Sequence, residues 1–223
     1  LMEVTGCGLA GVPALADGLM RWQSEFEAKT GLAWSEVLGS LGGELGVVFI
    51  LDRANMIDIP FVEGMQLPEP GFLFAVKVKN DLLYDHITSE LKKKTAVQLT
   101  DEKGLKMCAV PIPLPLPVQL EITVARAGDY LFLATHSKHV RNAVAGRDGK
   151  QPGLRQTPEF AALLKHLPAK GNNFIYVARR FSETIIGLQQ QLLESGRVPE
   201  KQAGVLRTLF LKHHRARRNR HHA

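Results

Sequence analysis

Cysteine is scarce in this chain of 223 residues, which contains only Cys7 and Cys108 and no Cys-x-x-Cys pair. A disulfide-rich scaffold is therefore excluded, and so is a zinc site built from paired cysteines. The two cysteines could form one disulfide or remain buried free thiols, and their spacing leaves both options open. The chain also lacks any run of about 18 apolar residues, so we expect no segment that spans a membrane as a helix.

The composition is that of a folded globular protein. Hydrophobic residues make up 45% of the chain and charged residues 22%, whereas a disordered chain has fewer apolar residues and a larger net charge. Glycine does not recur at every third position, which excludes a collagen-like chain. A chain of this length can bury about 70% of its unfolded surface, which is enough for one large core or two small ones.

The positive charge is concentrated at one end of the sequence. The formal net charge is +6, but residues 212–223 contain Lys212, four arginines and no acidic residue, so the remaining body is close to neutral. The four arginines are Arg215, Arg217, Arg218 and Arg220. Because an arginine fork matches two phosphate oxygens, salt-sensitive binding of nucleic acid or another polyanion is an alternative function. A solvated, disordered tail is the favoured interpretation, since no aromatic residue is present on which a base could stack, and nucleic acid is therefore a disfavoured partner.

Apolar residues at helical spacing predict a series of amphipathic helices. In the first, Leu15, Leu19, Trp22 and Phe26 share one face, and Gly31 ends the helix. Ser137 is expected to cap the fourth helix. The predicted helices cover residues 13–31, 34–41, 80–94, 136–145, 157–168, 181–194 and, more weakly, 202–212.

The strand signals are of two kinds. Residues 44–52 contain a continuous apolar run rich in valine and isoleucine, which predicts a central buried strand. After residue 95 the apolar period changes to two, with turn residues between the runs, and this predicts an antiparallel meander. The further strands are predicted over residues 72–78, 96–100, 105–110, 118–125, 130–135 and 174–178.

These elements predict an α+β fold, with a mostly antiparallel β-sheet in a meander and amphipathic helices packed on it. No internal repeat and no linker composition interrupts the chain. We therefore expect a single domain over residues 1–195, a weak C-terminal helix over 196–211 and the basic tail over 212–223.

Two proline-rich segments carry more apolar residues than a loop needs. Residues 53–71 contain Pro60, Pro68 and Pro70 and are predicted to form a long loop, and residues 111–117 alternate proline with apolar residues. We expect these loops either to contact a protein or envelope partner or to pack over the sheet. The candidate contact residues are Met56, Ile57, Phe61, Met65, Leu114 and Leu116.

No complete catalytic or metal-binding set is visible in the sequence. His136 and His139 lie three positions apart on one predicted helix, but a zinc site needs three or four ligands, so we expect exposed histidines at a helix start. Cys108 lies within an apolar strand, where burial would leave its thiol inert. We therefore predict no catalytic, cofactor-binding or metal-ligating residue and no cofactor. The function predicted is non-enzymatic, a partner-binding or structural module, with an undetected hydrolase as an alternative.

Several segments resemble one bacterial family of exported or envelope-associated domains of unknown function. They are Thr30-Gly31-Leu32, residues 38–44 (LGSLGGE) with the apolar strand that follows, residues 128–135 (GDYLFLAT), residues 157–160 (TPEF) and residues 173–177 (NFIYV). The resemblance covers about residues 1–195. It implies a periplasmic or envelope location and a parent protein longer than this chain, which begins with Leu1 and shows no complete signal peptide. It transfers no catalytic residue.

Overall fold

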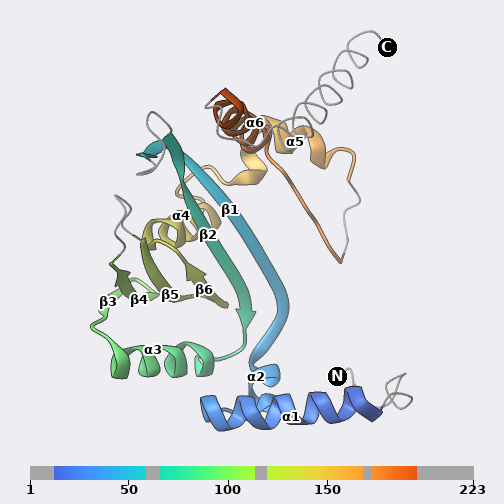
Figure 1. Cartoon of the computed structure of the whole chain (residues 1–223), viewed down its shortest axis with the longest axis vertical. Coiled ribbons are helices and arrows are strands. Elements are labelled where there is room, and N and C mark those ends of the chain that lie inside the picture. Colours follow the sequence, from blue (N-terminus) through green and yellow to red (C-terminus); the bar gives the residue numbers. More distant parts are fainter. Residues whose placement is uncertain (1–12, 59–65, 114–119, 168–171, 195–223) are drawn as a thin grey trace. The chain divides into compact units, whose positions relative to one another are not determined.

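The structure is a computed structural model that describes residues 13–58, 66–113, 120–167 and 172–194 (Figure 1). Within these ranges it contains six α-helices, one short 3-10 helix and a six-stranded antiparallel sheet. The predicted α+β fold is confirmed, and the predicted meander is present as four consecutive strands, β3 to β6.

The helices are α1 (Pro13–Thr30), α2 (Trp34–Ser40), α3 (Leu82–Lys94), α4 (Ser137–Arg147), the 3-10 helix η1 (Leu154–Gln156), α5 (Pro158–Leu164) and α6 (Arg179–Glu194). The strands are β1 (Leu41–Asp58), β2 (Gln66–Val78), β3 (Gln98–Glu102), β4 (Leu105–Ile112), β5 (Leu120–Ala127) and β6 (Tyr130–Ala134). None of these helices combines the length and the apolar character needed to cross a membrane.

Contacts along the chain divide it into two compact units. The first comprises Leu1–Val48, Phe72–Ile112 and Leu120–Asp148, and the second comprises Phe49–Gly71, Pro113–Gln119 and Gly149–Ala223. The division falls within β1 and β2 and not in a linker, which explains why the sequence shows no boundary. The single domain over residues 1–195 stays a prediction.

The strands follow each other in the order β1-β2-β6-β5-β4-β3, so β1 and β3 are the two edges of the sheet. β2 pairs antiparallel with β6, with Phe74 opposite Leu133, and α3 then carries the chain to the far edge at β3. The β3–β4 turn contains Lys103 and Gly104, both with positive φ (46° and 84°), as a two-residue hairpin of the primed type requires.

One face of the sheet packs against α4. Alternate residues of a strand point to opposite faces, so Ala125 and Ala127 of β5 share one face, and Val140 of α4 packs with them. The small alanine side chains allow the helix to lie close to the strands. The buried cluster comprises Leu73, Leu105, Met107, Ala125, Ala127, Phe132, Ala134 and Val140.

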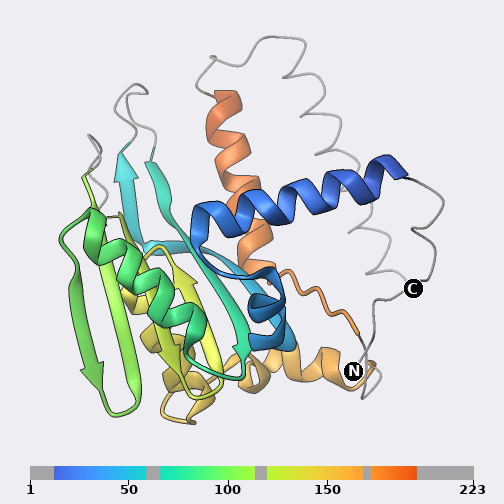
Figure 2. The ribbon, with the colours of Figure 1, turned by 90° about the horizontal axis from the view of Figure 1, so that it is seen from below.

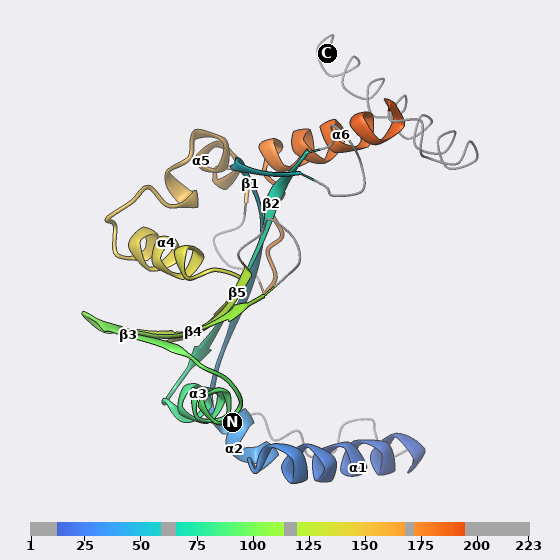
Figure 3. The same ribbon diagram turned by 60° about the vertical axis from the view of Figure 1, so that its left-hand side comes forward.

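The other face packs against α3. Val124 of β5 points to this face and joins Val78, Leu131 and the buried Tyr84 of α3, with Leu83, Ile87 and Leu91 partly buried around them. Figures 2 and 3 show α3 and α4 on opposite sides of the sheet. The first unit is therefore three layers deep, with β5 at its centre.

A charged network fixes the start of α3 to the strands below it. The Asp81 carboxylate accepts a hydrogen bond from Arg126 Nε at 2.9 Å and contacts Lys106 Nζ at 3.2 Å. Lys106, with Arg126 beside it, holds the pKa of Asp81 below its ordinary value. Asn80 Oδ1 accepts the backbone N–H of Leu82, so the short polar residues before the helix direct its first turn.

The second unit has its own small aromatic cluster. Phe160 of α5 is buried, and its ring packs edge to face against Phe174 and Tyr176, with centroids 5.6 and 5.0 Å apart. Glu159 accepts the backbone N–H of Arg179 at the start of α6. The predicted strand over residues 174–178 is wrong, because this segment is in no strand of the structure.

Two predictions about the first half of the chain are also wrong. Residues 44–52 were expected to form a central strand, but they belong to β1, an edge strand whose side chains are largely exposed. Residues 53–71 were expected to be a loop, but β1 continues to Asp58 and β2 already begins at Gln66. β2 accommodates Pro68 and Pro70 because its ladder with β6 covers only Leu73 to Lys77.

The packing predicts a large difference in stability between two apolar strand positions. Met107 is buried beneath α4, so Met107→Ala should lower the free energy of unfolding by about 2–5 kcal/mol through the lost contacts and the cavity. Leu99→Ala, on the exposed edge strand β3, should change it by no more than about 0.5 kcal/mol. Denaturant unfolding of both variants measures this. Equal effects at the two positions would contradict the packing described.

Candidate functional site

β1 exposes apolar side chains on both of its faces. Leu45 and Val47 lie on one face and Val48 on the other, because successive side chains of a strand point in opposite directions. The exposed fractions are 73% for Leu45, 47% for Val47, 48% for Val48 and 68% for Phe49. We call these four residues the β1 apolar segment. A contiguous exposed run of this kind is typical of an interaction surface.

The two edges of the sheet differ in a way that bears on function. β3 has only five residues, and four of them, Gln98, Thr100, Asp101 and Glu102, are polar or charged. Short length and charge are the usual means by which an edge strand avoids pairing with another chain. β1 has 18 residues, with no lysine and no proline among them. The edge at β3 is therefore protected, and the edge at β1 is not.

An ion pair and a hydrogen bond fix the start of β1 to strands β2 and β6. The Glu44 carboxylate contacts Lys77 Nζ of β2 at 2.6 Å and accepts a hydrogen bond from the Tyr130 hydroxyl of β6 at 2.7 Å. The hydrogen bond from Lys77, followed by the one from Tyr130, lowers the pKa of Glu44. A Cβ at Gly42 would lie 2.7 Å from Lys77 Cγ, so the absence of a side chain there leaves room for the Lys77 stem. These contacts orient the strand immediately before the β1 apolar segment.

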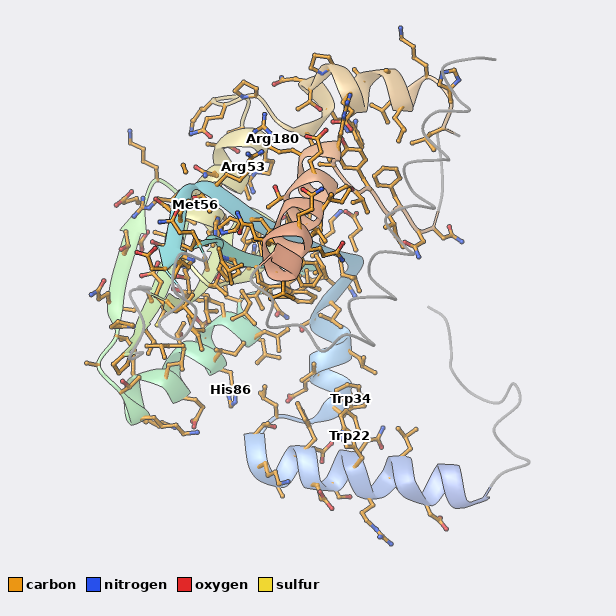
Figure 4. All side chains as sticks on the ribbon, turned by 45° about the horizontal axis from the view of Figure 1, so that its top comes forward. Trp22, Trp34, Arg53, Met56, His86 and Arg180 are labelled. Carbon is orange, nitrogen blue, oxygen red and sulfur yellow. The ribbon has the colours of Figure 1, made fainter. Side chains whose placement is uncertain are left out.

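A second apolar surface lies on the helices before β1. Trp22 and Phe26 of α1 pack against Trp34 of α2, with ring centroids 4.7 Å apart for the two tryptophans and 5.4 Å for Phe26 and Trp34 (Figure 4). Leu19, Met20 and Trp22 nevertheless remain largely exposed. The predicted apolar face of the first helix is therefore present, but only part of it is covered within the described residues.

A buried polar cluster surrounds the start of α4. His136 and His139 are both buried, and their rings meet edge to face with centroids 5.3 Å apart. The expectation of exposed histidines at this helix is therefore wrong. Thr123 of β5 is also buried, and its hydroxyl donates to Glu121 at 3.3 Å.

Glu121 of β5 performs the role that Ser137 was expected to play. His136 occupies the cap position of α4 and its side chain makes no capping bond, whereas the Glu121 carboxylate accepts the backbone N–H of Ser137. Burial raises the pKa of Glu121, but the hydrogen bonds from Ser137 and Thr123 outweigh burial, so its pKa lies below the ordinary value. A carboxylate at a helix N-terminus is also favoured by the helix dipole. The cluster is thus accounted for as a structural cap.

Cys108, the His136–His139 pair and His86 do not converge. Cys108 lies opposite Val124 in the β4–β5 ladder and so points to the α3 face, where burial raises the pKa of its thiol. The histidine pair belongs to α4 on the opposite face, and His86 lies on α3 (Figure 4). Cys108 is a free thiol. Among the described residues, no group of three or more histidine, cysteine or acidic side chains is arranged to hold a metal ion.

Few of the predicted contact residues fall within the described ranges. Met56 and Ile57 lie in β1 and not in a loop, with Met56 exposed and Ile57 partly buried (Figure 4). The other predicted sites lie outside the described residues: Phe61, Met65, Leu114, Leu116, Arg215, Arg217, Arg218 and Arg220. The β1 apolar segment was not predicted as a contact, because its composition is that of a strand covered on both faces.

Comparisons of the chain with protein-family models, with curated proteins and with solved structures found no match.

The cap at α4 predicts a specific pH dependence. Glu121→Gln removes the charge that accepts the Ser137 N–H, and it should lower the free energy of unfolding by about 0.5–2 kcal/mol at neutral pH, as loss of a helix cap does. Because the pKa of Glu121 is lowered by folding, its contribution is present above the pKa in the unfolded chain. It is lost as pH falls through the folded-state value, so the two proteins should converge in acid.

The matched control for this experiment is Glu102→Gln, which removes an exposed partner of Arg141 and should have the smaller effect. Denaturant unfolding across a pH series measures both variants. A Glu121→Gln deficit that is the same at every pH would contradict the assignment.

Proposed function

We propose that this chain is a non-enzymatic module that binds a protein partner along the edge strand β1. The observation that carries the proposal is the β1 apolar segment, in which apolar side chains are exposed on both faces of a strand that also has an open edge. An added strand would satisfy the outer backbone groups of β1, and its side chains would cover the apolar ones.

The chemistry of the remaining polar groups supports binding over catalysis. The Cys108 thiol is buried, with a pKa above its ordinary value, and is therefore a poor nucleophile. Glu121 is held as a helix cap by its hydrogen bonds with Thr123 and Ser137. Turnover of a substrate by the purified protein, abolished by changing one polar residue, would overturn this part of the proposal.

We also propose that the protein acts in the bacterial envelope or periplasm. The support for this location is the resemblance of the glycine turns, strand cores and helix caps to the exported family described above. The binding proposal does not depend on it.

A site-specific crosslinking experiment tests the binding function. A photo-reactive amino acid placed at Val48, in cells that naturally make the protein, should give a discrete adduct because Val48 lies in the contact. The same group at Leu99, which is 56% exposed on the opposite edge strand, is the matched control and should give none. No adduct at Val48, or equal adducts at both positions, would contradict the proposal.

A further inference from the structure

We infer that the partner at β1 is a second copy of this chain, which adds its own β1 in antiparallel orientation so that the two sheets become continuous. This inference rests on the proposed function and names the partner. Its basis is that β1 has the apolar composition of an interior strand but lies at the edge of the sheet.

β1 has the side chains of an interior strand. Residues 45–51, LGVVFIL, contain no charged residue and no proline, as is usual where a strand has neighbours on both sides. Within the described residues, β2 is its neighbour in the sheet and no strand lies on its other side. The missing neighbour should itself be an apolar strand of similar length, and β1 of another copy meets that requirement.

The strand is also self-complementary about a two-fold axis. Residues directly opposite each other in an antiparallel pair share a face, and an axis normal to the sheet preserves that face. The two-fold axis must therefore lie between the two copies of one residue. A pairing of one residue with its chain neighbour in the other copy would set side chains of opposite faces against each other. An axis at Phe49 sets Val47 opposite Leu51 and Val48 opposite Ile50, so that apolar side chains meet across the junction.

Charge disfavours the register in which the axis lies one residue earlier. With the axis at Val48, Glu44 of each copy would lie opposite Asp52 of the other, and like charges directly opposite each other are destabilising. With the axis at Phe49, Glu44 lies opposite Ala54 and remains bonded to Lys77 and Tyr130. A two-fold pairing of this kind closes on itself, so it gives a dimer and not a fibre.

Charge exchange at Val48 tests the inference on the full chain. The wild-type protein should be a dimer that dissociates on dilution, as measured by sedimentation and light scattering. In Val48→Lys and in Val48→Glu, like charges from the two copies lie within reach of each other at the junction, and each variant should dimerise about 100-fold more weakly. An equimolar mixture of the two variants should recover the dimer, because opposite charges then meet.

The matched controls are Leu99→Lys and Leu99→Glu on β3, which should remain dimeric like the wild type. Because Val48 is half exposed, circular dichroism and unfolding should show native folding of its variants. A wild-type protein that is monomeric at every concentration would overturn the inference, as would a dimer indifferent to charge at Val48 or an open-ended aggregate. A crosslink from Val48 to a different protein would keep the proposed function and reject the second copy.

Discussion

The alternation of side chains along β5 is the constraint on which the first unit of this structure depends. Val124 faces α3, while Ala125 and Ala127 face α4, so one strand supplies both buried layers. A shift of one residue in the pairing of β5 would exchange the two sets. Its ladders with β4 and β6 fix the register, and Arg126, bonded to Asp81, fixes the position of α3 on the same strand.

Because the middle strands are packed between helices, a surface for partner binding is expected at the edge strands. With both faces of β4, β5 and β6 used for packing, the surface that remains for a partner lies at the ends of the sheet. The chain protects one end with a short charged strand, β3, and leaves the other end long and apolar at β1. The contacts of Glu44 with Lys77 and Tyr130 fix the position of the start of β1, so the strand needs little rearrangement to pair with a partner.

The sequence was sufficient for elements whose signals are local. The meander over β3 to β6 follows from the period of two and from the turns at Lys103-Gly104 and Gly128-Asp129, and α3 and α6 follow from their apolar spacing. Elements whose position depends on contacts with residues distant in the sequence were predicted wrongly. Pro68 and Pro70 suggested a loop, because the sequence cannot show that β2 meets β6 only beyond them.

The candidate site illustrates the same limit of local patterns. The apolar run in β1 correctly indicated a strand, but its prediction as a central, buried strand was wrong, because a local pattern cannot show which strands lie beside it. The helix cap from Glu121 was also invisible, since the residue lies on a strand 16 positions away from Ser137. The buried positions of His136 and His139 follow from the packing of α4 and not from their spacing.

Amide hydrogen exchange along residues 45–51 tests the central claim most directly. In an isolated sheet every second amide of β1 bonds to β2, and the amides between them face outward and exchange quickly. If β1 pairs with a second copy, the outward amides should become protected as the protein concentration rises, while those of β3 stay unchanged. Outward amides in β1 that exchange at the same fast rate at low and high concentration would contradict the account.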